Sequence, residues 1–310
     1  MWAMSEMIEL LRMAVEPSEC DVMGHLNVRH YVGRAYDGLC ALAMRMGALD
    51  GDGGRSRGQR FSVREQHVRF HRELRPGAAY RMVGGVLSVT DTDLSAYAEL
   101  YRVHGREGET LAATAITRAT LVERGTGKPI ALDGVARSKL ASHLVSLPEH
   151  GAPRGVASYP PRPTPTRADA VAAGMVGAYL GPVDPAECDA GGGMLPIGYM
   201  GRMSNGIPHF LAKRGLDRQV GMGGAALEYR FVYRGDAHLG EQIEIFSGLR
   251  SVERKTRHFC HWIFNAHTGA CLATSHGVAV MFDLEARRAV ALDETQRREL
   301  ELLANPALGA

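Results

Sequence analysis

The sequence predicts an α+β protein made of two copies of one domain, each a five-stranded antiparallel sheet wrapped around one long helix. Two observations lead to this prediction. The 310-residue chain repeats itself, since residues 17–47 align without a gap on residues 185–215. In each copy, an apolar stripe with helical spacing is followed by segments in which apolar residues alternate. A single helix followed by a run of strands is the order expected when the helix packs on one face of an antiparallel sheet.

The internal repeat marks the domain boundaries. The offset between the copies is 168 over the best-matched segment and falls to 163, 161 and 160 further along, with each change in or near a turn-like stretch. The predicted organisation is an N-terminal domain at 1–145, a proline-rich linker at 146–167 and a C-terminal domain at 168–310. The shared residues are Pro17/Pro185, Glu19/Glu187, Cys20/Cys188, Asp21/Asp189, Gly24/Gly192, Tyr31/Tyr199, Gly33/Gly201, Arg34/Arg202, Gly38/Gly206 and Gly47/Gly215.

One long helix is predicted near the start of each copy. In the first copy, its apolar stripe comprises Tyr31, Ala35, Leu39, Leu42 and Met46. The stripe in the second copy runs from Tyr199 to Phe210, and a glycine follows each helix as a C-terminal cap. Pro196 suits the first position of the second helix. The N-caps are therefore Asn27 and Leu195, of which only Asn27 has a side chain that caps well.

The strands are predicted from alternating and β-branched segments. In the first copy they lie near 7–15, 65–72, 79–90, 95–105 and 110–122. The clearest strands of the second copy are 257–270, which ends in a Thr-Gly turn, and 271–283.

Composition narrows the function classes. Apolar residues make up 45% and charged residues 23%, and the net charge of +2 arises without long blocks of one sign. This pattern argues against nucleic-acid or membrane partners, which require clustered positive charge, and favours a small-molecule ligand. The five scattered cysteines show no metal-ligand spacing, and no signal peptide or membrane helix is recognisable. We expect no metal site and a cytoplasmic location.

A polar turn precedes each predicted helix. In the first copy it contains Asp21, Gly24, His25 and Asn27. The second copy keeps Asp189 and Gly192 but has Gly193 and Leu195 in place of the histidine and the asparagine. The first turn is therefore the more complete candidate site.

A long helix across a five-stranded antiparallel sheet, opened by a D-x-x-G-H-x-N turn, resembles the hotdog fold of acyl-CoA thioesterases. The nearest sets of motifs are those of the 4-hydroxybenzoyl-CoA thioesterases and the plant-type acyl-carrier-protein thioesterases. The duplication resembles a tandem, or double, hotdog, in which one chain imitates the usual dimer. The resemblance implies an acyl-CoA or acyl-carrier-protein thioesterase, with coenzyme A or pantetheine present only as part of the substrate. It also implies that the double hotdogs can pair as a homodimer.

The resemblance assigns roles to the residues of the turn. Asp21 occupies the place of the nucleophile or general base, and Asp189 occupies it in the second copy. In the D-x-N-x-H-x-N-N motif of the acyl-carrier-protein enzymes, His25 and Asn27 match at the fifth and seventh positions. Met23 and Val28 depart from that motif. The N–H groups of the helix end would stabilise the oxyanion, and Gly24 and Gly192 would let the thioester carbonyl approach the backbone closely.

Several alternatives stay open at this point. Asp21 could serve only the turn, Asn27 could be only an N-cap, and His25 could be merely solvated. Glu65 and Glu228 share a repeat position on a strand and are candidates for contact with substrate, or else for an exposed face or an ion pair. A hotdog hydratase or dehydratase acting on enoyl or hydroxyacyl thioesters is a second enzyme class. A non-catalytic protein that binds acyl thioesters is a third interpretation.

Overall fold

The computed structural model describes residues 7–52, 58–156, 161–215, 221–286 and 288–310. The chain divides into two compact units, Met1–Ala152 and Pro153–Ala310. The division falls inside residues 146–167, which we propose as the linker.

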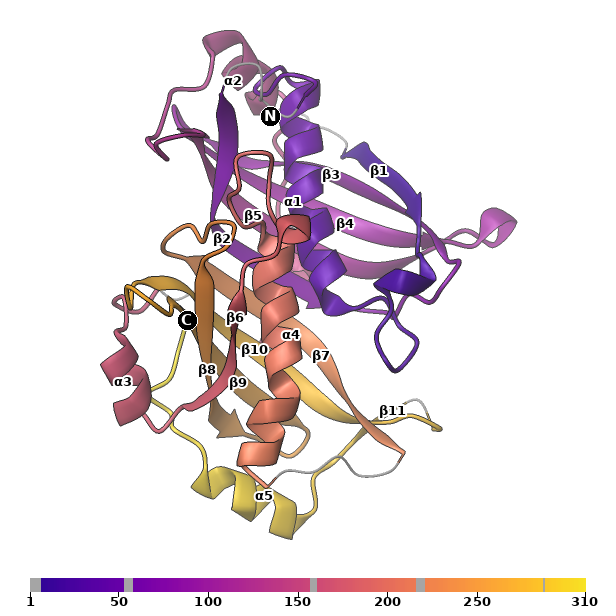
Figure 1. The fold of residues 1–310 in the computed structure, drawn as a ribbon. Coiled ribbons are helices and arrows are strands. Elements are labelled where there is room, and N and C mark those ends of the chain that lie inside the picture. The colour runs from indigo at the N-terminus through magenta and orange to yellow at the C-terminus, as the bar shows by residue number, and fades with distance from the viewer. Residues whose placement is uncertain (1–6, 53–57, 157–160, 216–220, 287) are drawn as a thin grey trace. The chain divides into compact units, whose positions relative to one another are not determined.

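The first unit is one antiparallel sheet with a long helix on it (Figure 1). Its strand order is β1-β3-β4-β5-β2, and helix α1 contacts all five strands. The predicted helix and strands are confirmed, except that β2 begins earlier than its sequence pattern indicated. The elements are β1 Ile8–Ala14, α1 Val28–Arg45, β2 Gln59–Phe70, β3 Ala79–Val89, β4 Asp93–Val103, β5 Glu109–Glu123 and α2 Gly134–Ala141, with 3-10 turns at Pro17–Glu19, Gly105–Glu107 and Glu149–Gly151.

The second unit repeats this arrangement. Its antiparallel order is β7-β10-β9-β8-β6, with the short β11 added beside β10, and α4 packs against β6 and β8. The prediction of about five strands did not include β11. The elements are α3 Arg167–Ala172, β6 Val176–Pro182, α4 Pro196–Lys213, β7 Met222–Tyr233, β8 Gln242–Val252, β9 Thr256–Asn265, β10 Cys271–Asp283, β11 Arg288–Val290 and α5 Glu294–Leu302, with a 3-10 turn at Pro185–Glu187.

The helix boundaries follow from local chemistry. The Asn27 side chain accepts the Arg29 N–H, which fulfils the predicted N-cap, whereas Leu195 makes no side-chain cap. Past the C-terminal ends, Gly47 and Gly215 adopt φ values of +77° and +64°, a conformation that favours glycine. The predicted helix ends are therefore confirmed.

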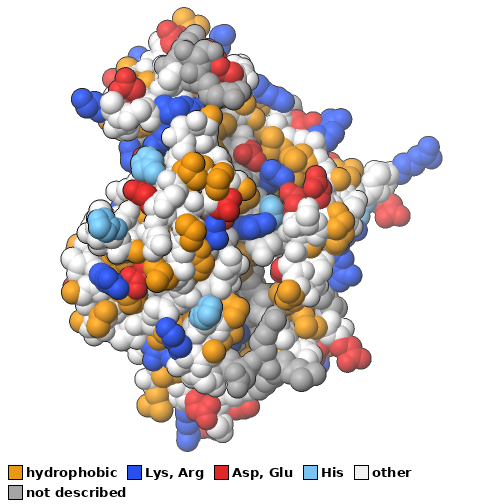
Figure 2. All heavy atoms as spheres, viewed as in Figure 1, with side chains coloured by type: hydrophobic (Ala, Val, Ile, Leu, Met, Phe, Trp, Pro, Cys, Tyr) orange, Lys and Arg blue, Asp and Glu red, His pale blue; other side chains and the backbone are white. Residues whose placement is uncertain are grey.

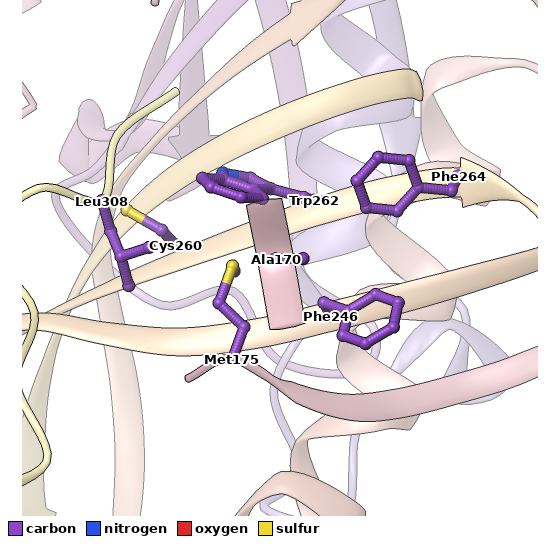
Figure 3. Close-up of a cluster of buried hydrophobic side chains, with 7 residues drawn as sticks. All are labelled: Ala170, Met175, Phe246, Cys260, Trp262, Phe264 and Leu308. Atoms are coloured by element: carbon purple, nitrogen blue, oxygen red, sulfur yellow. The ribbon is translucent and has the colours of Figure 1, made fainter. Parts of the chain in front are cut away.

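The alternation of side chains gives the second sheet two different faces. Phe259 on β9 contacts Phe210 of α4, with ring centroids 5.9 Å apart, so Phe259 and its alternate neighbours face the helix. Trp262 lies on the opposite face and is 1% exposed. It belongs to a buried apolar cluster whose members come from β8, β9, α3, the residue before β6 and the C-terminal end, as shown in Figure 3: Ala170, Met175, Phe246, Cys260, Trp262, Phe264 and Leu308.

The proposed linker packs against the sheets over part of its length. In the first unit, Gly151 lies so close to Tyr97 that a Cβ atom at this position would be 2.5 Å from the tyrosine ring. In the second unit, the buried Glu228 carboxylate accepts the N–H groups of Arg154, Gly155 and Val156 at 2.8, 2.6 and 3.2 Å. These contacts were not visible in the proline-rich composition, because they depend on residues distant in sequence.

Within the described residues, no helix is long and apolar enough to cross a membrane. All five cysteines are free thiols. On the face shown in Figure 2, basic and acidic side chains are interspersed.

Candidate active site

The candidate site is built on a tight turn before helix α1. The Asp21 N–H donates to the His25 carbonyl at 2.8 Å, and the Gly24 N–H donates to the Asp21 carbonyl at 3.0 Å. The Asp21 Oδ1 atom accepts the N–H groups of Met23 at 2.8 Å and His25 at 3.3 Å. Gly24 has a φ of +74°, which explains the glycine. The aspartate therefore stabilises its own turn, which is the structural role that the sequence left open.

The second copy forms the same turn before α4. The Asp189 N–H donates to the Gly193 carbonyl at 2.8 Å, and Gly192 has a φ of +80°. Asp189 Oδ1 accepts the N–H groups of Gly191 and Gly193 at 2.8 and 3.1 Å. A shared turn conformation is therefore sufficient to explain why both copies keep the aspartate and the following glycine.

The turn before α1 does not use all of the Asp21 carboxylate. Only one Asp21 oxygen is used by the turn, and Oδ2 has no hydrogen-bond partner in the described part of the chain. The Asp21 side chain is partly exposed. A Cβ atom on Gly24 would meet no other heavy atom of the described residues within 4 Å, so the space beside the turn is open. A partly exposed carboxylate with an oxygen that the turn does not use can meet a ligand.

The first N–H groups of helix α1 lie beside this turn. Asn27 Oδ1 accepts the Arg29 N–H at 3.0 Å, and the Asn27 carbonyl accepts the His30 N–H at 2.9 Å. Among the described residues, nothing accepts the Val28 N–H. An unpaired donor at a helix N-terminus, supported by the positive end of the helix dipole, suits a developing negative charge.

The second helix start is different. Pro196 occupies the first position of α4 and has no N–H, and Leu195 provides no polar side chain. Gly193 replaces the histidine. The second turn therefore keeps the aspartate but lacks three of the polar groups that surround Asp21.

A glutamate that the motif did not indicate holds His25. The His25 Nε2 atom lies 2.9 Å from Glu73 Oε2, and the histidine side chain is only 13% exposed. Glu73 follows strand β2 and is placed by the hydrogen bond from the Leu26 N–H to the Leu74 carbonyl, at 2.8 Å. His25 is therefore an oriented imidazole, in contrast to the merely solvated histidine that the sequence also allowed. The sequence repeat did point to this position, because its offset of 163 places Asp236 opposite Glu73, so both copies have an acidic residue there.

An ion pair anchors each turn to its helix. Arg34 on α1 donates to Glu19 Oε1 at 2.7 Å, and Glu19 Oε2 accepts the Glu16 N–H at 3.1 Å. In the second copy, Arg202 lies 2.8 Å from Glu187. Burial raises the pKa of Glu187, and Arg202 opposes that shift. The glutamate and the arginine of each pair are among the residues that the two copies share. The ion pair between them explains why both copies keep both residues.

We expect Arg34→Met to lower the free energy of unfolding by about 2 kcal/mol, because it leaves a mostly buried carboxylate without its cation. Chemical denaturation measures this change. Arg12→Met is the matched control, since Arg12 pairs with Glu9 but has a side chain that is 77% exposed. The control should change stability by less than about 0.5 kcal/mol. Equal losses in both variants would contradict the anchoring role.

The cysteine beside each aspartate is not the reactive group. Burial raises the pKa of the Cys20 thiol, and the neighbouring Asp21 and Glu19 carboxylates add to this shift. The Cys20 side chain donates to the Glu16 carbonyl at 3.6 Å and is half-buried. A protonated thiol is a poor nucleophile.

The two strand glutamates lie away from the helices. Glu65 is paired in register with Arg118 on β5, and their side chains approach to 3.5 Å. Gln66, the next residue, donates to the Val32 carbonyl of α1, so Glu65 points to the other face of its sheet. Glu228 likewise alternates with helix-facing residues of β7 and binds the N–H groups of 154–156. The structure therefore does not place Glu65 or Glu228 on the helix-facing side of its own sheet.

Comparison with known proteins gives one family and several similar folds. The family model described as the thioesterase-like superfamily matches residues 15–141 and 183–300, which together are more than half of the chain. No curated protein matches the sequence.

Solved structures match both copies together. A provisionally assigned oleoyl thioesterase from Lactobacillus plantarum has 11% identity and a TM-score of 0.65, with 90% of this chain and 97% of that chain covered. An acyl-ACP thioesterase from Bacteroides thetaiotaomicron has 12% identity and a TM-score of 0.62, with coverage of 87% and 96%. A 12:0-ACP thioesterase from Umbellularia californica has 10% identity and a TM-score of 0.63, with coverage of 89% and 97%. The predicted tandem hotdog fold is confirmed by these likenesses.

Proposed function

Because the chain belongs to the thioesterase-like superfamily, we propose that it hydrolyses an acyl thioester to a free acid and a thiol, with Asp21 as the central catalytic residue. The observation that carries this proposal is the Asp21 carboxylate, which is partly exposed and has an Oδ2 atom without a partner in the described residues, next to a helix end whose Val28 N–H is also unpaired there. The fold and the family support thioester chemistry; the role of each residue is our inference.

The proposed reaction uses Asp21 as a general base or as a nucleophile. As a base, Oδ2 takes a proton from water, whose oxygen bonds to the thioester carbon. The carbonyl oxygen becomes an oxyanion, which the Val28 N–H and the helix dipole stabilise. The carbon–sulfur bond then breaks, the acid forms, and the leaving sulfur takes up a proton. As a nucleophile, Oδ2 itself bonds to the carbon, the carbon–sulfur bond breaks, and the sulfur takes up a proton and leaves as the thiol. Water then hydrolyses the resulting anhydride to the free acid and the Asp21 carboxylate.

His25 is proposed to orient the water or the thioester oxygen. Its contact with Glu73 restricts the ring, as expected for a positioned imidazole. Asn27 is proposed to act through the helix end that it caps, since its Oδ1 already accepts the Arg29 N–H.

The proposal is tested by a thiol-release assay on the full chain. The substrates are short, long, branched and aromatic acyl-CoAs, together with acyl-carrier-protein thioesters of matched chain length. We expect thiol release above background for at least one acyl group. Comparison of acyl-CoA with acyl-carrier-protein thioesters of the same acyl group then shows which of the two thiols the protein accepts. A complete panel with no release above a heat-treated control would contradict the proposal.

A binding protein is the second candidate. The observation that favours it is the second turn, which has Gly193, Leu195 and Pro196 in place of polar groups. Saturable binding of an acyl-CoA without turnover, unchanged in Asp21→Asn, would select this function over hydrolysis.

A further inference from the structure

Arg29, in the first turn of helix α1, carries a positive charge that no carboxylate of the described residues balances. Its Nε atom donates to His30 Nε2 at 3.1 Å, and its two Nη atoms have no hydrogen-bond partner in the described part of the chain. The side chain is half-buried. The helix dipole opposes a cation at the N-terminal end of a helix, and a partly buried cation loses hydration. The stability of the helix therefore does not explain this arginine.

His30 holds the guanidinium in place. An arginine side chain can only donate, so His30 Nε2 is the acceptor and the proton of the neutral ring lies on Nδ1. His30 Nδ1 lies 3.4 Å from Glu19 Oε1, and the histidine is 8% exposed. Burial, together with the neighbouring Arg29, lowers the pKa of His30 to about 4, which keeps the ring neutral. These contacts fix the Nε side of Arg29 and leave its Nη atoms for another partner.

The second copy has neither residue. Ile197 and Gly198 stand in place of Arg29 and His30. A Cβ atom at Gly198 would lie 2.6 Å from Cε of Met194, so a side chain at this position would require Met194 to move. The ion pair between a glutamate and an arginine is nevertheless present in both copies. The turn and its anchoring ion pair therefore form without Arg29 and His30, and these two residues belong with the polar groups that only the first copy has.

The unpaired edge of the guanidinium matches an anion with two oxygens. The two Nη atoms lie in one plane and donate in parallel, which suits a carboxylate or a phosphate. Arg29 directly follows Val28, whose N–H is the proposed oxyanion donor, so an anion bound by Arg29 lies beside the same turn of α1 as the reacting carbonyl. All of these residues belong to the unit Met1–Ala152. The arrangement therefore needs nothing from the second unit.

We propose that Arg29 binds an anionic group of the thioester substrate through its two Nη atoms. This inference rests on the proposed thioesterase function and specifies its substrate class. A carboxylate at the end of the acyl group and the phosphates of the thiol share the required chemistry. The experiment below separates these two sources.

The test uses four thioesters and the full chain. They combine the best acyl group of the thiol-release panel, with and without a terminal carboxylate, with coenzyme A or with N-acetylcysteamine, which carries no phosphate. We expect Arg29→Gln to raise KM at least about tenfold for substrates that carry the recognised anion, with kcat changed less than about twofold. The cause is that a group remote from the reacting carbon binds equally in the ground state and the transition state. The thioester without any anion should keep its KM.

The four substrates identify the anion. An increase in KM confined to the two carboxylated thioesters assigns the acyl carboxylate, and an increase confined to the two coenzyme A thioesters assigns a phosphate. Equal increases for all four thioesters, the uncharged one included, would overturn the proposal. So would an unchanged KM for all of them.

Arg45→Gln is the matched control, because Arg45 is an exposed cation at the other end of the same helix. It removes the same charge and should leave every KM unchanged, whereas an increase equal to that of Arg29→Gln would reduce the effect to net charge and overturn the proposal. Arg29→Lys should recover part of the lost affinity, since it keeps the charge without the parallel N–H pair. Arg29→Gln should not lower Tm, because it removes an unbalanced cation from the positive end of a helix dipole.

Failure of the thioesterase function would be distinguished by binding. If none of the four thioesters is hydrolysed, titration calorimetry with the same compounds measures their affinities directly. Binding of an anionic thioester that weakens at least about tenfold in Arg29→Gln, but not in Arg45→Gln, would support the role of Arg29 without catalysis. Equal affinities in the wild-type protein and both variants would contradict it.

Discussion

Asp21→Asn should lower kcat for thiol release by at least about 100-fold, the usual scale for loss of a general base. The substitution tests the charge specifically, because asparagine keeps the Oδ1 atom that accepts the Met23 and His25 N–H groups. The turn should therefore be preserved while the negative charge is removed. Steady-state kinetics on the best substrate of the panel measure the loss, and an unchanged Tm confirms that the turn still folds.

Asp189→Asn is the matched control, since Asp189 makes the same turn contacts in the second copy. We expect it to retain most of the activity, because that copy lacks the counterparts of His25 and Asn27. Loss of activity in Asp189→Asn with full activity in Asp21→Asn would reverse the assignment. Full activity in both variants would exclude the turn aspartates as catalytic residues.

Acid should strongly destabilise the second unit. Burial lowers the pKa of His261 to about 4, and burial together with the neighbouring His258 lowers that of His276 to about 3. The unfolded chain binds these protons near the ordinary histidine pKa of about 6.5, so below that pH the unfolded state takes up more protons than the native state. The free energy of unfolding therefore has its full value above pH 6.5. As the pH is lowered below 6.5, it falls by about 1.4 kcal/mol per pH unit for each histidine. Between pH 6.5 and 4.5, His261 and His276 together should lower the free energy of unfolding by about 5 kcal/mol.

Urea denaturation from pH 7.5 to 4.5 measures this dependence. Trp262 is 1% exposed and reports on unfolding of its own unit. The chain has two tryptophans, so Trp2→Phe makes Trp262 the only tryptophan, whose emission can be excited selectively. His276→Gln should reduce the pH slope but not abolish it, because burial also lowers the pKa of His261 and of His258. His267→Gln, at an exposed turn position, should leave the slope unchanged. A stability that stays constant down to pH 4.5 would contradict neutral, buried histidines.

The duplicated architecture and much of the candidate turn could be read directly from the sequence. Helix periodicity, Asn27 and Gly47 predicted where α1 begins and ends, because caps and stripes are encoded by residues close together in the chain. Asp21 and Gly24 were found in the same way, since a turn is local.

Contacts between distant residues could not be read in this way. Glu73 reaches His25 only because strand β2 ends beside the turn, and the 154–156 backbone reaches Glu228 only when the chain crosses the second sheet. Glu65 and Glu228 were considered as substrate contacts because they share a repeat position on a strand. Alternation shows which residues of a strand share a face, but it does not show which face that is.

By itself, then, the sequence determined two related domains, their helix ends and the aspartate turn, since each depends on interactions a few residues apart. The tertiary structure decided what those residues meet. It showed that Asp21 has one oxygen in its turn and another without a partner in the described residues, and that Glu65 meets Arg118 on the neighbouring strand. The physical reason is strand register, because pairing across a sheet brings together side chains whose separation along the chain carries no sign of their contact.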